Sequence, residues 1–169
     1  MSNLHGNFGI GHVRYPTAGG IGKEFAQPMY VNTPYGISLA HNGNLTNSKK
    51  LAAELFHAER RHINTDSDSE VLLNIFALEL SKQEAVFPKP KDFFAAVEKT
   101  HLRINGAYAV VALITGYGIV AFRDPLGIRP LTIGVRKGKN RNEYVVSSET
   151  ALSVSYTHLR AQRRTPISY

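Results

Sequence analysis

The segment 107–115 constrains the fold more than any other part of this sequence. It reads Ala-Tyr-Ala-Val-Val-Ala-Leu-Ile-Thr and is apolar almost throughout. An apolar run of this kind, without alternating polar residues, predicts a strand that is buried on both faces. A Gly-Tyr-Gly turn at 116–118 leads into a second short strand at 119–122. Because so short a connection joins antiparallel neighbours, these two segments predict part of an antiparallel sheet.

Further strands and helices complete the expected layout. Two strands are expected at 131–135 and 144–146, joined by a polar turn. Three upstream segments have helical patterns, and the second of them follows a capping-box signature. These helical segments are 48–62, with Leu51, Leu55 and Ala58 on its apolar face; the one that follows Ser67-Asp68-Ser69-Glu70; and 92–103, with Phe93, Phe94 and Val97 as its apolar stripe. Short-linked strands in a meander, with helices covering sheet faces, predict the α+β class.

The N-terminal third is expected to be less regular. Residues 8–13 (Phe-Gly-Ile-Gly-His-Val) predict a strand under close packing, because two glycines allow another chain to approach. Residues 14–34 contain three prolines and no helical period, which predicts a long ordered loop of the kind that is often functional. A strand-like run follows at 35–39.

Composition and charge exclude several classes of function. The 169 residues fit one domain, and no apolar run approaches the roughly 18 residues that span a bilayer, so no membrane partner is expected. The net charge of +7 raises the alternative of a nucleic-acid-binding domain. Its distribution argues against that alternative, because three arginines lie in the last ten residues and no aromatic ladder accompanies the basic residues. The absence of cysteine excludes disulfides, thiolate metal sites and thiol catalysis within this chain.

The motif Ala40-His41-Asn42-Gly43-Asn44-Leu45-Thr46 has two interpretations. Asn-Gly is typical of a hairpin or a strand-to-helix turn, since both residues tolerate positive φ. Alternatively, the Asn42 amide and the Gly43 N–H form an oxyanion hole, in which two donors converge on one developing negative oxygen. His12 and His41 flank this region, but no third ligand at useful spacing accompanies them, so no metal site is expected.

Arg14 and Asp68 also admit a structural and a functional interpretation. Arg14 can be an ordinary surface residue, or its guanidinium can bind a carboxylate bidentately. Asp68 can stabilise the first turn of a helix, or it can hold an ammonium group. Together with Asn42-Gly43, these groups supply what a free α-amino acid with a side-chain amide requires.

Four motifs carry a specific resemblance to a known family. They resemble the class II glutamine amidotransferases and, more narrowly, the glutaminase domain of the amidophosphoribosyltransferase family, collinearly from about Asn7 to Leu152. The motifs are Gly11-His12-Val13-Arg14-Tyr15-Pro16-Thr17, Ala40 to Asn47, Asn64 to Glu70, and Phe122-Arg123-Asp124-Pro125-Leu126-Gly127-Ile128-Arg129-Pro130-Leu131. The last one contains the Pro and Gly of a β-turn, and we assign it no catalytic role.

The resemblance implies a fold and a set of roles. The fold would be that of the N-terminal nucleophile hydrolases, a four-layer sandwich of two antiparallel sheets between helix layers, here incomplete. Arg14 would bind the glutamine carboxylate, Asp68 the amino group, and Thr17 would belong to the same substrate-binding set. Asn42 and Gly43 would form the oxyanion hole. In the family, an N-terminal Cys attacks the amide, and ammonia passes to a second domain that uses phosphoribosyl pyrophosphate and Mg²⁺ in the first step of purine biosynthesis.

This chain departs from the family pattern, and the departures define our expectations. It has no Cys, so we expect a fragment, 1–154, of the amidotransferase domain that is inactive by itself and contains no cofactor. Residues 155–169 resemble read-through of a sequencing adapter, and we expect a non-native or disordered tail. The parent enzyme is expected to be cytoplasmic and homo-oligomeric, and whether it carries an iron–sulfur cluster is left open.

Two alternatives stay close to this assignment. One is a catalytically dead glutamine-binding module that functions as encoded. The other is the glutaminase domain of another class II enzyme, such as glucosamine-6-phosphate synthase, which resembles the first motifs but not 123–131. An in-frame upstream continuation that begins Met-Cys-Gly would identify a fragment of an active enzyme.

Overall fold

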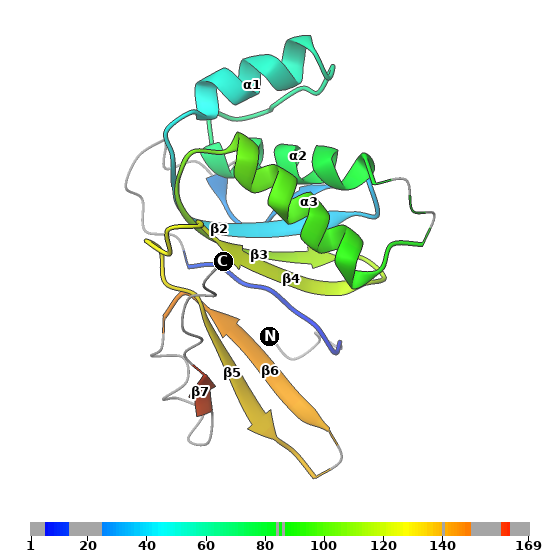
Figure 1. The fold of residues 1–169 in the computed structure, drawn as a ribbon, viewed down its shortest axis with the longest axis vertical. Coiled ribbons are helices and arrows are strands. Elements are labelled where there is room, and N and C mark those ends of the chain that lie inside the picture. The colour runs from blue at the N-terminus through cyan, green and yellow to red at the C-terminus, as the bar shows by residue number, and fades with distance from the viewer. Residues whose placement is uncertain are drawn as a thin grey trace.

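A computed structural model shows two antiparallel sheets and three helices (Figure 1). It describes residues 6–13, 25–83, 85, 87–139 and 141–149, and the backbone of 160–162. The elements in chain order are β1 (Met29–Val31), β2 (Ile37–Leu45), α1 (Ser48–His57), α2 (Asp68–Ser81), α3 (Pro90–Arg103), β3 (Gly106–Ile114), β4 (Gly118–Arg123), β5 (Thr132–Lys137), β6 (Asn142–Ser147) and β7 (Arg160–Gln162). None of the described helices is long and apolar enough to cross a membrane.

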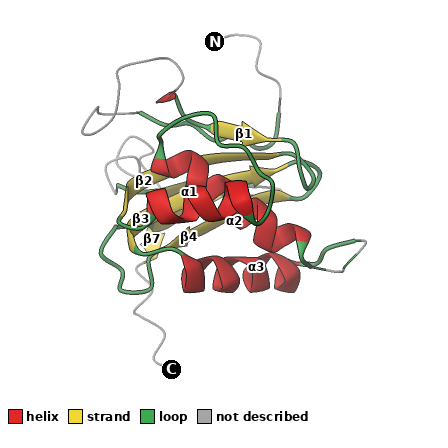
Figure 2. Ribbon diagram, turned by 90° about the horizontal axis from the view of Figure 1, so that it is seen from above, coloured by secondary structure: helices red, strands yellow, loops and turns green. Residues whose placement is uncertain are grey.

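The elements form three layers in the described part of the chain. The helices lie on one side of a four-stranded sheet of order β1-β2-β3-β4, and the three-stranded sheet β6-β5-β7 lies on the other side (Figure 1). Seen from the helix side, α1, α2 and α3 cover the larger sheet (Figure 2). The predicted α+β class is confirmed, as is an incomplete version of the four-layer sandwich, with the layers helix, sheet and sheet. The expected meander is divided, because β4 pairs with β3 and β5 pairs with β6, whereas β4 and β5 belong to different sheets.

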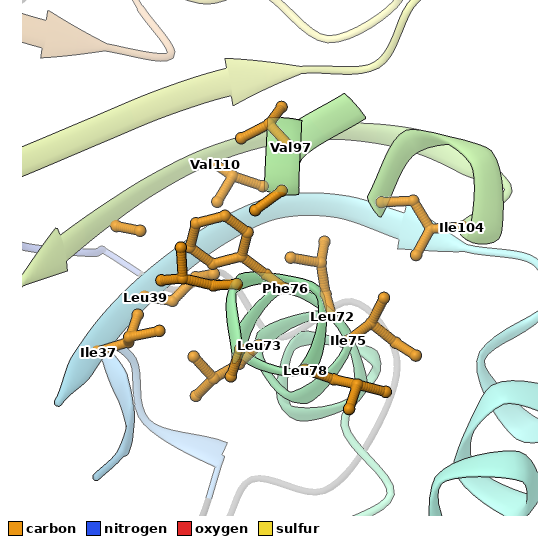
Figure 3. Close-up of a cluster of buried hydrophobic side chains, with 14 of the residues drawn as sticks. Ile37, Leu39, Leu72, Leu73, Ile75, Phe76, Leu78, Val97, Ile104 and Val110 are labelled. Atoms are coloured by element: carbon orange, nitrogen blue, oxygen red, sulfur yellow. The ribbon is translucent and has the colours of Figure 1, made fainter. Parts of the chain in front are cut away.

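The core lies between the larger sheet and α2. This helix is buried almost all round, so it has little amphipathic character, as expected for a helix enclosed by other elements. Its Phe76, Leu72 and Leu73 pack against strand residues such as Ile37 and Leu39 (Figure 3). Burial of each such side chain contributes about 1.5–3 kcal/mol, which makes α2 the main support of β2 and β3.

The strand β3 only partly matches the expectation of burial on both faces. Its helix-facing residues Tyr108, Val110, Ala112 and Ile114 are all buried. On the opposite face, Val111 and Leu113 are only partly buried. The reason is that this face turns toward the cavity described below, rather than toward a second helix layer.

Polar side chains join the helices to one another. Arg103 at the end of α3 donates to Glu79 of α2 and to Glu54 of α1, each at 2.6 Å. The side chain of Asn47, just before α1, donates to Arg103 O and accepts from Asn105 N–H. These bonds fix the connection from β2 to α1 against the connection from α3 to β3.

Two of the expected helix boundaries were wrong. The first helix ends at His57 rather than at 62, because Arg60 adopts a positive φ of 53° and the N–H of Arg61 turns back to Leu55 O at 2.9 Å. Such a left-handed residue closes the last helical turn. The third helix begins at Pro90, two residues earlier than expected, and Phe94 is 66% exposed rather than part of the apolar stripe.

The strands also differ from the expectation in two places. Residues 8–13 form no strand, and β1 lies inside the segment 14–34 that was expected to be a loop. Within 155–169, which we expect to be a non-native or disordered tail, residues 160–162 pair with the free edge of β5. Backbone groups at a sheet edge accept almost any sequence as a partner, so side-chain patterns predict such pairings poorly.

The capping box before α2 forms in part. Ser67 caps the helix by accepting from Ser69 N–H at 3.3 Å. Glu70, the expected second member, instead accepts four hydrogen bonds from the backbones and side chains of Asn64 and Thr65 at 2.7–2.9 Å. Burial alone would raise the pKa of Glu70, but these hydrogen bonds outweigh burial and hold its pKa below the ordinary value. Glu70 therefore fixes the loop that leads into the helix.

We predict that Glu70→Gln lowers the free energy of unfolding by about 1–3 kcal/mol at neutral pH, because donors that face a carboxylate lose their acceptor. Since the folded-state pKa lies below the unfolded-state value, the wild-type stabilisation is complete above that unfolded value and is lost as the pH falls through the folded one. Urea denaturation at neutral and acidic pH measures both effects. Glu98→Gln, at an exposed position of α3, is the matched control, and equal losses in the two variants would contradict the prediction.

Candidate functional site

The N–H groups of successive β2 residues point alternately to the two edges of the strand, and this alternation determines the arrangement of donors at the site. In an antiparallel pair, every second residue bonds to the partner strand. The bonds that bracket the β2–β3 pairing are Thr115 N–H to Gly36 O at 3.0 Å and Thr46 N–H to Asn105 O at 2.8 Å. Even-numbered residues of β2 therefore bond to β3. The odd-numbered N–H groups point to the opposite edge, toward β1.

The short strand β1 covers only the beginning of that edge. Its pairing with β2 reaches as far as Met29 opposite Leu39. Beyond this point a side chain replaces the strand, because the N–H of His41 donates to Gln27 Oε1 at 2.6 Å. If the β1–β2 register continued, Gln27 would lie opposite His41, two residues beyond the Met29–Leu39 pair.

Farther along the same edge, a carboxylate accepts a second N–H. Leu45 N–H donates to Asp68 Oδ2 at 2.9 Å, and this bond ties the end of β2 to the first turn of α2. The Gly43 N–H lies between these two satisfied groups and has no hydrogen-bond partner among the described residues. As far as the described residues are concerned, it is available as a donor to a ligand.

Only glycine fits at position 43. Its φ is +153°, a conformation that residues with a Cβ rarely adopt, and a Cβ would lie 2.0 Å from Ala107 O and 2.7 Å from Tyr108 Cα. The backbone of β3 occupies that space, so the clash cannot be relieved by a side-chain rotation. The Asn-Gly motif is thus neither the hairpin nor the strand-to-helix turn that the local sequence allows, because both residues lie inside β2.

The proposed donors and the carboxylate share one cavity. Asn42, Gly43 and Asp68 all line a space of about 2450 Å³ between the two sheets, together with His12, His41 and Gln27. The side chain of Asn42 points to the face of β2 opposite His41 and makes no hydrogen bond to another described residue. Within the described part of the chain, the cavity therefore offers two amide donors without a hydrogen-bond partner and one carboxylate.

The ring of His41 lies beside Ser69 and Asp68 and is neutral at pH 7. Burial lowers its pKa to about 4; the Asp68 carboxylate raises this pKa, and the positive charges of His12 and Arg129 lower it further. Its Nδ1 lies 3.0 Å from Ser69 Oγ and 3.9 Å from Asp68 Oδ1. The Nε2 atom is buried and forms no hydrogen bond to a described residue.

Asp124 organises the loop that ends β4, and it does not join the site. Gly127 N–H donates to Asp124 O at 2.8 Å, which forms the β-turn expected from the Pro and Gly of this motif. The Asp124 carboxylate accepts from the N–H groups of Tyr108, Ile128 and Arg129. Burial would raise the pKa of Asp124, but these bonds and the Arg123 charge hold it below the usual range. The residue has a structural role, in agreement with the sequence interpretation.

The predicted site residues are only partly covered by the structure. It brings Asn42, Gly43 and Asp68 to one cavity, although they come from different elements. Arg14 and Thr17 lie outside the described residues. Sequence reasoning missed Gln27, which belongs to none of the motifs that it used, and Ser69, which lies in the Asn64 to Glu70 motif but was given no role; both are connected through contacts across 14 and 42 positions of the chain.

A family model for the glutamine amidotransferase domain matches residues 21–153. The chain belongs to the glutamine amidotransferase family. This assignment agrees with the pairing of Asn42-Gly43 and Asp68 around one cavity, and it confirms the expected class of protein.

Comparison with relatives indicates which members of the family this amidotransferase chain is similar to. It is 59% identical over 151 residues to the amidophosphoribosyltransferase of Escherichia coli K12, an alignment that covers 89% of the chain and 30% of the relative. It is 57% identical over 150 residues to that of Pseudomonas aeruginosa, with the same coverage, and 39% identical over 155 residues to that of Methanocaldococcus jannaschii, covering 90% and 30%. The chain thus spans about 30% of the length of these relatives.

A solved structure supports the fold of the amidotransferase chain. The glutamine phosphoribosylpyrophosphate amidotransferase from Bacillus subtilis, complexed with ADP and GMP, superimposes with a TM-score of 0.64 at 28% identity. The match covers 90% of this chain and 34% of that one. Likeness over nearly the whole chain confirms the expected fold class.

We predict that Gly43→Ala lowers the free energy of unfolding by about 3 kcal/mol, the upper range for overpacking, because its Cβ would meet backbone atoms of β3. Thermal or urea denaturation measures the loss. Gly9→Ala is the control, since a Cβ there meets nothing within 4 Å. If both variants lose equally little stability, the close approach of β2 and β3 at Gly43 is wrong.

Proposed function

We propose that this chain binds glutamine as the glutaminase part of an amidophosphoribosyltransferase. One observation carries the proposal: the Gly43 N–H, which has no partner among the described residues, lies between two neighbours whose N–H groups are held by Gln27 and Asp68. A strand edge that leaves a single donor open beside a carboxylate suits an amide substrate with an amino group. The relatives named above support the choice of this enzyme within the family.

Each group has a distinct task in this proposal. Asp68 uses Oδ2 for Leu45 N–H, which leaves Oδ1 to accept from the glutamine ammonium group. The Asn42 amide and the Gly43 N–H donate to the side-chain amide oxygen, and they would stabilise the negative charge that develops there during attack by a nucleophile. By resemblance to the family, Arg14 binds the substrate carboxylate, and Thr17 contributes to the same binding set.

The absence of cysteine separates binding from hydrolysis in this chain. In the family, the thiol of an N-terminal Cys attacks the amide carbon, and ammonia leaves with a thioester formed on the enzyme. No thiol of this chain can perform that step. The same absence favours the second candidate, a glutamine-binding module without catalysis, which would use the identical contacts.

The remaining partners belong to the parent enzyme in this proposal. Phosphoribosyl pyrophosphate and Mg²⁺ would be used by a transferase domain of the parent enzyme. No group of three His, Cys, Asp or Glu side chains within the described residues could hold a metal ion, so we assign Mg²⁺ to no residue here. We place the parent in the cytoplasm as a homo-oligomer, and we leave its iron–sulfur content open.

We predict that Asp68→Asn weakens glutamine binding at least tenfold, because the ammonium group loses its anionic partner while the amide retains the shape of the side chain. Isothermal titration of the chain with glutamine measures the dissociation constant. Asp66→Asn is the matched control, because it removes the same charge two residues earlier and also lines the cavity. Equal effects of the two substitutions would show that only the overall negative charge of the cavity matters, and would remove Asp68 from the site.

We also predict that the purified 169-residue chain releases no ammonia from glutamine. The reason is chemical: an oxyanion hole stabilises a tetrahedral centre only after a nucleophile has attacked. A coupled glutamate dehydrogenase assay measures glutamate formation against an enzyme-free blank. Turnover above the blank that disappears in Asp68→Asn would disprove this prediction and reveal another nucleophile.

A further inference from the structure

The side chain of Gln27 has an orientation that its partners determine. The backbone N–H of His41 is only a donor, so the atom that faces it at 2.6 Å must be the amide oxygen. The other end of the amide, Nε2, then donates to Ser69 Oγ at 3.0 Å. Gln27 therefore bridges the edge of β2 and the first turn of α2 with one side chain.

Gln27 also bears on the hydrogen bond between Ser69 and His41. Ser69 Oγ accepts from Gln27 Nε2, and a hydroxyl oxygen can accept a second hydrogen bond or donate its own hydrogen, so the 3.0 Å contact with His41 Nδ1 allows either direction. In the relay from Gln27 through Ser69 to His41 that is argued below, Ser69 donates to Nδ1. A neutral imidazole that accepts at Nδ1 carries its proton on Nε2. Ser69 and His41 are both buried, with 2% and 3% of their surfaces exposed, so the contact between them is shielded from water.

We propose that Gln27 is a positioning residue of the glutamine site: it replaces a strand partner at His41 and, through Ser69, holds the Gly43 N–H and the Asp68 carboxylate in a fixed relation. The proposal rests on the proposed function and goes beyond the residues that touch substrate. His41 and Ser69 each neighbour a site residue along the chain, Asn42 and Asp68 respectively. A bond between them therefore sets the spacing between the two ends of the substrate site.

Two substitutions distinguish the role of the Gln27 amide oxygen from the role of its amide nitrogen. Gln27→Glu retains the acceptor for His41 N–H but removes the donor to Ser69 Oγ. Gln27→Met has nearly the same length and removes both. Gln83→Glu and Gln83→Met are the matched controls, because Gln83 lies at the far end of α2, where its Nε2 donates to Glu79 O, and it does not line the cavity.

The position of the proton on the His41 ring, measured in the ligand-free chain, tests the hydrogen-bond relay from Gln27 through Ser69 to His41. Long-range ¹H–¹⁵N correlation spectra of the His41 ring are expected to show the proton on Nε2 in the wild type and in both Gln83 variants. In Gln27→Glu the Ser69 hydroxyl turns to the new carboxylate, so His41 is expected to carry a proton on Nδ1. A wild-type ring with its proton on Nδ1 alone, or a Gln27→Glu ring unchanged from wild type, would overturn the relay.

Titration with glutamine tests the positioning role. Gln27→Met is expected to weaken binding about 2- to 10-fold, because the hydrogen bonds to His41 N–H and to Ser69 Oγ are both lost, and to reduce the shift of the Gly43 amide resonance on glutamine addition. Gln27→Glu is expected to retain wild-type affinity within about threefold, since it keeps the acceptor for His41 N–H. Unchanged affinity and an unchanged Gly43 shift in Gln27→Met would overturn the proposal.

The His41 spectrum and the glutamine affinity together distinguish a failure of this inference from a failure of the proposed function. If the wild-type chain binds no glutamine, the proposed function fails on this chain, while the His41 spectrum still decides the relay. If Asp68→Asn abolishes binding and Gln27→Met does not change it, the site stands and the positioning role falls. If Gln27→Met does not fold, the Gln27→Glu spectrum and affinity decide alone.

Discussion

The unpaired edge of β2 is the constraint on which the site depends. A buried peptide N–H without an acceptor is costly, so the edge beyond β1 must find acceptors other than a strand. Side chains supply them, with Gln27 at His41 and Asp68 at Leu45. Because these acceptors take the N–H groups on either side, the intervening Gly43 N–H has no acceptor among the residues that the structure describes. The bonds that complete the sheet edge thus also define the position of the proposed substrate oxygen.

The core explains why this edge can be held so accurately. Helix α2 is buried along nearly its whole length, and its first turn carries both Asp68 and Ser69. A helix fixed by packing on several sides cannot shift without opening cavities, so the groups at its N-terminus are fixed with it. The hydrogen bonds from Asn64 and Thr65 to Glu70 secure the chain that enters this turn. Packing, rather than the site's own few polar contacts, provides the rigidity.

Sequence patterns predicted those parts of the fold in which neighbours along the chain decide the structure. The strand at 107–115, the helix after Ser67 and the turn at Asp124 all emerged close to their expected bounds. Failures arose where a distant segment decides. Asn42-Gly43 favours a turn locally, yet pairing with β3 keeps it in a strand, and Glu70 bonds to the preceding loop instead of its helix N-cap. The residues proposed to touch substrate belong to recognisable motifs, whereas the contacts of Gln27 and Ser69 with each other and with His41 join distant parts of the chain.

The neutrality of His41 also serves the site. Its Nδ1 lies 3.9 Å from Asp68 Oδ1, the oxygen that the proposed function assigns to the glutamine ammonium group. A protonated imidazole at that distance would form an ion pair with Asp68 and compete with the substrate for the carboxylate. Burial lowers the pKa of His41 to about 4, although Asp68 raises it, so the ring is uncharged at neutral pH. The desolvation that makes this histidine a poor base therefore keeps the carboxylate available, and the Ser69 hydroxyl satisfies Nδ1 without adding a positive charge.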